Sequence, residues 1–313
     1  MLISKPIFLV GAERSGTTML RLMLSHHPQI AWCNEFEYVV DQISRDGQWP
    51  PLDQYYEWLQ THRIFRATGF ELDMGLTYPQ LANSFLVQKR DRTDKPIVGA
   101  TVHRHFNRLL KIWPDARFIH IIRDGRDVAR SNIGMGWAGN VWTGVQRWFE
   151  VESLWQTLSH QLTRDRWIEV TYEALISNPE QELTRLCDFI GPTYDPGMLS
   201  YSQDSSFEFP DPKYIGQWQR KLSDHQIQLI ESKIADLLVA RGYELSGLPP
   251  IQLSPLAEKQ LKLQDWWGRF QFRLNRYGPS LFAQDYLARN LGLKSWEKQL
   301  KLKINGIDAT YLK

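Results

Sequence analysis

A glycine-framed, hydroxyl-rich loop near the start of the chain carries the residues best suited to chemistry. Residues 9–20 read LVGAERSGTTML, an apolar run followed by a glycine, four residues and Gly16. A loop of this outline between a strand and a helix presents backbone N–H groups to a phosphate-like anion, and Ser15, Thr17 and Thr18 add hydroxyl donors. The alternative is a tight turn that binds nothing, but the polar run ERSGT argues against it.

The positively charged residue of this loop is not at the position where nucleotide-hydrolysing proteins carry it. Nucleotide-hydrolysing proteins follow the second glycine with a lysine for the β- and γ-phosphates and a hydroxyl for Mg²⁺. Here Thr17 stands at the lysine position, and Arg14 inside the loop is the nearest cation. The pattern therefore favours an anion held by Arg14, hydroxyls and backbone over a magnesium nucleotide. A P-loop nucleotide kinase stays open as an alternative.

A second basic motif, RDGRDVARS, spans residues 123–131 and follows an apolar strand. Ser131 comes eight residues after Arg123, about two helical turns later. An arginine fork and a serine hydroxyl can grip one phosphate together. The alternatives are a salt-bridged turn and a magnesium-binding Asp124, and the missing lysine speaks against the latter.

Strand-like and helix-like patterns alternate along the chain. They predict an α/β fold, a P-loop-like parallel sheet flanked by helices, with the carboxyl ends of the strands on one ligand-binding edge. We expect strands at 6–11, 96–99, 116–123 and 167–172, and helices at 17–27, 104–112, from 128, and at 143–163, 179–190 and 223–241. The polar and aromatic region 35–95 has weak helical patterns and is expected to form long excursions, and residues 36–95 are expected to wall the acceptor pocket. A linker at 246–256 and a basic, aromatic helical extension follow, which predicts a domain at 1–245 and an extension at 246–313.

Composition limits the classes of partner and location. The net charge is +2, which is too balanced for nucleic acid or an anionic membrane as the main partner. Cys33 and Cys187 lie far apart, and no cluster has metal-ligand spacing, so no metal is expected. The short apolar N-terminal run does not suit a signal peptide, and no run is long enough for a membrane span. We expect a cytoplasmic protein and leave a homodimer open.

These motifs resemble a known family. The run VGAERSGTTMLRLML resembles the 5′-phosphosulfate loop of sulfotransferases that use 3′-phosphoadenosine 5′-phosphosulfate (PAPS), and HPQIAWCNEFE is similar to their tyrosylprotein branch. The resemblance extends through RDGRDVARS, VTYEALISNPEQELTRLCDFIG, IGQWQRKLS and GYEL, and covers roughly residues 6–245. It implies sulfuryl transfer from PAPS to a hydroxyl acceptor (a small molecule, a sugar or a peptide tyrosine), with adenosine 3′,5′-bisphosphate (PAP) as product and no metal.

The resemblance also implies roles for individual residues. Arg123 and Ser131 would bind the 3′-phosphate, Tyr172 the adenine, and Lys213, in a loop at 205–221, a phosphate. Glu35, twenty-one residues after Arg14, would be the general base. The 5′-phosphosulfate would lie on the loop itself, at Arg14, Ser15, Gly16, Thr17 and Thr18.

Other candidates for the base are weaker, and two positions depart from the family. His103 and His105 are the alternative bases, whereas Glu37 is interpreted as a solvent-exposed carboxylate. Ala100 stands where many relatives have a lysine, and Met135 where the tyrosylprotein branch has an arginine. Losing a cation near the transferring group should slow the reaction. A non-catalytic PAP- or PAPS-binding protein therefore stays open as an alternative.

Overall fold

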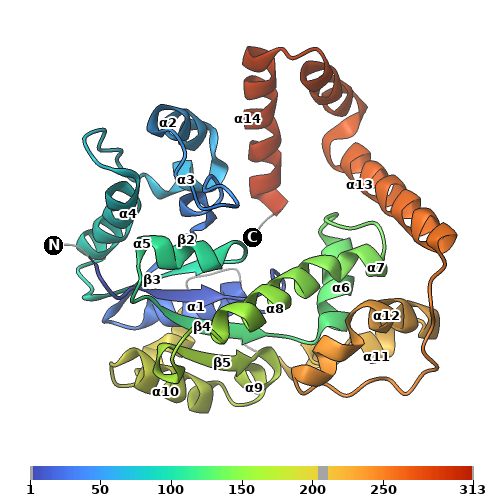
Figure 1. The fold of residues 1–313 in the computed structure, drawn as a ribbon, viewed down its shortest axis with the longest axis horizontal. Coiled ribbons are helices and arrows are strands. Elements are labelled where there is room, and N and C mark those ends of the chain that lie inside the picture. The colour runs from blue at the N-terminus through green and yellow to red at the C-terminus, as the bar shows by residue number, and fades with distance from the viewer. Residues whose placement is uncertain (1–2, 204–210, 312–313) are drawn as a thin grey trace. The chain divides into compact units, whose positions relative to one another are not determined.

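The core of the fold is a five-stranded parallel sheet in the first part of the chain (Figure 1). The computed structural model describes residues 3–203 and 211–311. The strand order is β2-β3-β1-β4-β5, and every neighbouring pair is parallel. The predicted helix-flanked parallel sheet is therefore confirmed. The strands are β1 (Ile7–Val10), β2 (Ile30–Glu35), β3 (Ile97–Val102), β4 (Arg117–Ile122) and β5 (Trp167–Thr171).

Continuous apolar runs form the middle of this sheet because helices cover both of its faces. All four residues of β1 are buried, and so are five of the six in β4. The edge strand β2 was not among the predicted strands, and its first four residues are buried while its last two are exposed. Trp32 of β2 lies over Gly99 of β3, where a Cβ would come within 2.2 Å of the ring. Because Gly99 has no side chain, the Trp32 ring of the edge strand β2 can pack directly over β3.

Helices connect the strands of the sheet. The predicted helix at 179–190 is observed as α10 (Pro179–Ile190), and the helix after the phosphate-like loop as α1 (Thr17–His26). The region expected to form long excursions is largely helical. The helices between β2 and β4 are α2 (Leu52–Thr61), α3 (Arg63–Thr68), α4 (Tyr78–Thr93) and α5 (Leu109–Ile112). Those after β4 include α6 (Gly125–Gly134), α7 (Val141–Gly144), α8 (Gln146–Ser159), α9 (Tyr172–Ser177) and α11 (Trp218–Lys221).

The chain divides into two compact units. The first contains the sheet and consists of residues 1–128 and 147–220. The second joins residues 129–146 to 221–313. The division at 245/246 expected from the sequence stays a prediction.

The second unit is built from helices, chiefly α12 (Asp224–Ala240), α13 (Pro255–Asn290) and α14 (Lys294–Tyr311). Helix α12 starts at a capping box in which Ser223 and Gln226 satisfy each other's backbone N–H groups. Helix α13 is kinked at Gly278, which has a φ of 74° and precedes Pro279. In the ranges that the structure describes, no helix combines the length and apolar character needed to span a membrane.

Candidate anion-binding site

The loop after β1 is held in a shape that only glycine permits at two positions. A Cβ on Gly11 would come within 2.3 Å of the carbonyl oxygen of Ile121 in β4. Gly16 has a φ of 89°, and a Cβ there would come within 2.5 Å of the Tyr172 ring. Between them, Arg14 itself has a φ of 71°, which is uncommon for a residue with a side chain. The loop is thus pressed against the ends of β4 and β5.

The loop leaves polar groups available to a ligand. Gly16 is the N-cap of α1 and has no side chain to cap the first-turn N–H groups. The Ser15 side chain is fully buried, and its hydroxyl has no hydrogen-bond partner in the described part of the chain. Buried hydroxyls are normally paired, so the Ser15 hydroxyl is a donor that the described part of the protein leaves unused. Thr17 and Thr18 begin α1 and follow on the same turn.

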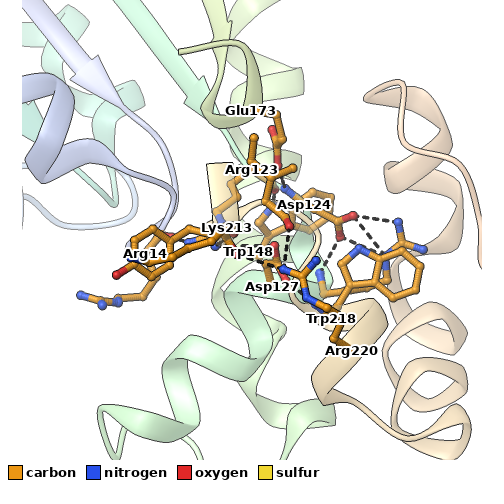
Figure 2. Close-up of polar contacts among 12 residues, drawn as sticks. Arg14, Arg123, Asp124, Asp127, Trp148, Glu173, Lys213, Trp218 and Arg220 are labelled. Atoms are coloured by element: carbon orange, nitrogen blue, oxygen red, sulfur yellow. Dashed lines mark hydrogen bonds and ion pairs between the residues drawn. The ribbon is translucent and has the colours of Figure 1, made fainter. Parts of the chain in front are cut away.

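Arg123, the residue after β4, reaches across to this loop. Its Nη1 donates to the backbone carbonyl of Arg14 over 3.2 Å, and its Nη2 donates to that of Tyr214 over 2.8 Å. The guanidinium carbon lies 4.2 Å from the centre of the Tyr172 ring. Figure 2 shows the dashed contacts around Arg123 and its neighbours. The Arg123 Nε is buried without a partner among the described residues, which leaves one donor of the fork unused.

The positive charge of Arg123 acts on the nearby Arg14 guanidinium. Burial, followed by the nearby Arg123 guanidinium, lowers the pKa of Arg14, whereas Tyr172 acts in the opposite direction. Two cations that converge on one loop repel each other, and an anion between them would relieve that repulsion. The electrostatics of the loop therefore favour a ligand with negative charge.

Ion pairs hold the segment after Arg123 in place (Figure 2). The Arg126 Nη2 lies 2.7 Å from Asp124 Oδ2, and the Arg126 guanidinium lies 3.6 Å from the centre of the Trp218 ring. Asp127 accepts a 2.7 Å hydrogen bond from the Trp218 backbone and lies 3.5 Å from Arg123. Asp124 is therefore the partner of an arginine, and Asp127 helps to orient the arginine that reaches the loop.

The other predicted binding residues are more dispersed. Tyr172 is buried and forms the first residue of α9, one residue beyond the end of β5. Lys213 is largely exposed on the 3-10 helix η5 (Pro212–Tyr214), where its ammonium group lies 2.6 Å from Asp211. Ser131 lies on the part of α6 that belongs to the second unit. Part of the predicted loop at 205–221, residues 205–210, lies outside the described residues.

Glu35 is the last residue of β2, at the carboxyl edge of the sheet to which β1 delivers the loop. Its side chain is exposed. Glu35 also contributes to the electrostatics of Arg21 on α1: burial lowers the pKa of Arg21, and the Glu35 carboxylate counteracts this. The Arg21 guanidinium donates to the Asn34 side chain next to Glu35.

Glu37 is not the exposed carboxylate that the sequence suggested. It is buried in the 3-10 helix η1 (Glu37–Val39), and its Oε1 accepts a 2.8 Å hydrogen bond from the His103 backbone. Burial raises its pKa to about 7, against the opposing effect of His103. Its Oε2 is buried and has no partner in the ranges that the structure covers. The turn of η1, which carries the side chain inward, could not be read from residue spacing.

His103 connects this carboxylate to the loop. Its Nδ1 lies 3.0 Å from the Gly11 carbonyl, so Nδ1 carries the proton and donates it. Burial disfavours its charged form, but the carboxylates of Glu37, Glu13 and Glu35 outweigh burial and raise the pKa of His103. The pair Glu37–His103 is therefore a second set of titratable groups against the loop, which the sequence signalled only as a histidine near the end of a strand.

The two departures from the family pattern lie in different settings. Ala100 is fully buried within β3, in register with Phe8 of β1 and Cys33 of β2. Met135 follows α6 in the second unit. Neither residue supplies a cation. Arg123 contacts the Arg14 backbone at the loop, and Arg147 pairs with Glu13 of the same loop over 2.9 Å.

Fold and site together define a class of protein. A parallel sheet with a glycine-framed loop between β1 and the N-terminus of α1 is typical of P-loop-like proteins that bind phosphate-bearing ligands. Within this class, the model of the sulfotransferase family matches residues 6–196. The chain belongs to the sulfotransferase family, as its motifs predicted.

Comparisons with known proteins agree with this assignment. Protein-tyrosine sulfotransferase A of Caenorhabditis elegans is 25% identical over 210 residues, which cover 63% of this chain and 52% of that protein. Protein-tyrosine sulfotransferase 2 of Gallus gallus is 24% identical and is covered to 71%, with 78% of this chain. The omega-hydroxy-beta-dihydromenaquinone-9 sulfotransferase of Mycobacterium bovis is 26% identical, with 79% of this chain and 65% of that protein covered. The chain thus spans about half the length of the nematode relative.

Solved structures share the fold. The sulfotransferase domain from the curacin biosynthetic pathway superposes with a TM-score of 0.56 and 16% identity, covering 78% of this chain and all of that domain. The sulfotransferase domain of the Synechococcus PCC 7002 olefin synthase gives a TM-score of 0.55 and 20% identity, covering 79% of this chain and 98% of that domain. At such identities the likeness concerns the fold alone.

Proposed function

We propose that the protein transfers a sulfuryl group from PAPS to a hydroxyl acceptor. The observation that carries the proposal is the contact of Arg123 with the Arg14 carbonyl, which joins two arginines at a loop with an unpaired buried hydroxyl. Such a site suits a ligand with separate anionic groups and needs no lysine. Membership of the sulfotransferase family supports PAPS as that ligand.

Each predicted residue has a role in this proposal. Arg123, together with Ser131, binds the 3′-phosphate, and Tyr172, which already packs against Arg123, borders the nucleoside. Lys213 is a further phosphate contact. The 5′-phosphosulfate binds to Arg14, Ser15, Gly16, Thr17 and Thr18.

Glu35 is the general base of the proposed reaction. PAPS, when bound, supplies the sulfuryl group and a phosphate as leaving group. The acceptor oxygen forms a bond to sulfur as the bond from sulfur to the phosphate oxygen breaks, and the acceptor proton passes to the Glu35 carboxylate. Arg14 stabilises the negative charge that grows on the transferring group, a task for which Ala100 offers no second cation.

The acceptor is proposed only as a class. The relatives are named for protein tyrosine and for an omega-hydroxy menaquinone, which are both hydroxyl acceptors. A small molecule, a sugar and a peptide tyrosine all remain within the proposal. The cytoplasmic location and the homodimer stay predictions.

Calorimetry with PAP in buffer containing a chelator tests the proposal. Wild type should bind PAP without metal, and Arg123→Ala should bind at least tenfold more weakly, because a charge-assisted bond is lost. Arg185→Ala is the matched control, since Arg185 is a half-exposed arginine that pairs with Glu182 on α10. Binding of ATP only with Mg²⁺ would instead identify a kinase. PAP binding without transfer from labelled PAPS to a panel of phenols, sugars and tyrosine peptides would identify a non-catalytic binding protein.

A further inference from the structure

The C-terminal segment differs in charge from the rest of the chain. Residues 255–313 contain eleven lysines and arginines against five aspartates and glutamates, a net charge of +6. The whole chain has a net charge of +2, so residues 1–254 have a net charge of −4. Such an asymmetry directs an anionic partner to the segment rather than to the molecule as a whole.

One side of α13 packs against residues 139–143 of the second unit. The buried Asp265 accepts hydrogen bonds from the Gly139 backbone over 2.7 Å and from the Thr143 hydroxyl over 2.6 Å. Gly268, one turn later, packs so closely that a Cβ would come within 2.7 Å of the Gly139 Cα. This side fixes the rotation of the helix about its axis.

The opposite side of α13 carries large apolar side chains. Successive helical residues are rotated by about 100°, so Trp267 and Leu263 project roughly opposite Asp265. We call the following group the aromatic face: Leu256, Leu263, Trp266, Trp267 and Phe270. The first four are each at least half exposed, from 50% to 66%. Phe270 stacks on both tryptophans, with 5.5 Å between ring centres in each pair.

Basic side chains accompany the aromatic face. Lys259, Lys262 and Arg273 are exposed before the kink at Gly278 and lie along one flank of the aromatic face, since the same 100° step places them about 60–120° from Asp265. Tryptophan and leucine on one side of a helix, with lysine and arginine beside them, is the pattern of helices that lie in the interface of an anionic membrane. Of the thirteen large exposed apolar side chains among the described residues, nine lie in residues 255–311, and six of these nine lie in α13.

We propose that the aromatic face of α13 binds the surface of an anionic lipid bilayer, with the helix lying in the plane of the interface. The indole rings of Trp266 and Trp267 enter the boundary between head groups and acyl chains, where amphipathic aromatic rings are favoured. The lysines bind the anionic head groups, and each contributes about fivefold to the affinity. A second copy of the chain is a poorer occupant, because it would bring the same positive charge to the contact.

Sedimentation of the full chain with vesicles tests this surface. Vesicles of phosphatidylcholine and phosphatidylglycerol in a ratio of about 7:3 should bind the protein at least tenfold more tightly than phosphatidylcholine alone. The binding should weaken in high salt. Brominated acyl chains should quench part of the tryptophan fluorescence of the wild type, because rings in the interface lie within reach of the bromine.

Paired variants identify the side chains. Trp266→Gln with Trp267→Gln should weaken vesicle binding at least tenfold and remove the quenching, since the apolar area that enters the interface is lost. Met74→Gln with Val239→Gln removes two exposed apolar side chains elsewhere and should bind like wild type. Lys259→Gln with Lys262→Gln should weaken binding to the anionic vesicles roughly twentyfold or more and leave binding to phosphatidylcholine unchanged. Circular dichroism checks that each variant is folded.

Three results would overturn the proposal. The first is vesicle binding by the folded double tryptophan variant that equals that of the wild type. The second is no vesicle binding by wild type together with a dimer, seen by sedimentation velocity, that the tryptophan variant loses, which would assign the face to a second copy. The third is binding to polyglutamate as tight as to the anionic vesicles, which would assign it to an acidic protein.

Discussion

The Nη1 of Arg123 donates a hydrogen bond to the backbone carbonyl of Arg14 over 3.2 Å. This contact joins the residue after β4 to the loop after β1, although 109 positions separate the two in sequence. It brings the two arginine motifs into contact. Since the Arg123 Nε has no partner among the described residues, the same side chain both braces the loop and keeps a donor for a ligand.

The contact between Gly16 and Tyr172 leads to a stability prediction. Gly16→Ala adds a Cβ within 2.5 Å of the Tyr172 ring at a φ of 89°, so it combines a steric clash with backbone strain. Gly191→Ala is the control in the same unit, because Gly191 has a φ of 121° and none of the described atoms lies within 4 Å of its Cβ position. We expect about 1 kcal/mol of destabilisation from Gly191→Ala and at least twice as much from Gly16→Ala, measured by urea unfolding. Equal losses of unfolding free energy in the two variants would show that the Tyr172 ring moves away from the added Cβ without cost.

The buried Glu37 predicts a pH-dependent stability. Its folded pKa of about 7 lies above its ordinary value of 4.5, so the folded state binds a proton more tightly than the unfolded state. The pKa of His103 is also raised, which has the same sign. The stabilisation that these bound protons give the folded state is complete below pH 4.5, and it is lost as the pH rises towards and beyond 7.

Glu37→Gln isolates this effect because glutamine keeps an oxygen to accept from the His103 N–H. As the pH rises from 5 to 7.5, the free energy of unfolding of the variant should increase relative to that of the wild type by about 1–3 kcal/mol. Urea unfolding midpoints at several pH values measure this difference. Asp53→Asn, a change at an exposed carboxylate in the first turn of α2, should leave the pH profile of the wild type unchanged. Parallel profiles for wild type and Glu37→Gln would contradict a titrating Glu37.

The buried strands and the edge strand β5 were predictable, whereas the other edge strand, β2, was not. Strands β1 and β4 read as continuous apolar runs because both faces of the sheet are covered there. Strand β2 mixes tryptophan, cysteine and polar residues, so its pattern did not predict a strand. The burial of Glu37 follows from that same strand, since β2 and η1 together carry the side chain inward.

Local sequence patterns also could not predict which segments of the chain make up the second unit. Asp265 binds Gly139 and Thr143, and Asn140 donates to the Leu261 carbonyl over 2.7 Å. These contacts join segments more than 120 positions apart and bring residues 129–146 together with the C-terminal helices. Hydrophobic periodicity gives the helices but not such pairings, because it describes each element alone.

His120 predicts a second pH effect within the sheet. Its two ring nitrogens lie 2.9 Å from Glu169 and 3.1 Å from Glu152, and its ring stacks on Trp155. Burial disfavours the charged imidazole, but the two carboxylates outweigh burial and raise its pKa. The stabilisation by His120 is therefore full below the unfolded pKa of about 6.5 and is lost as the pH rises through the higher folded value.

His120→Gln should destabilise the protein by about 2–4 kcal/mol near pH 6, because it leaves two carboxylates without their cation. The loss should shrink as the pH rises, which thermal unfolding between pH 5.5 and pH 9 would follow. His160→Gln is the control, since His160 is exposed at the end of α8. A loss that does not vary with pH would mean that His120 is neutral in the folded state.

Glu35 and Glu37 can be distinguished by kinetics, because the first is exposed at the end of β2 and the second is buried behind His103. If Glu35 takes the acceptor proton, Glu35→Gln should lower kcat by about 10²–10⁴ with PAP affinity unchanged. Glu37→Gln should bind PAP and retain most of kcat, since its glutamine still accepts from His103. Labelled-PAPS turnover with an active acceptor, paired with calorimetry, measures both. If Glu37→Gln loses kcat while Glu35→Gln keeps it, the base belongs to the Glu37–His103 pair instead.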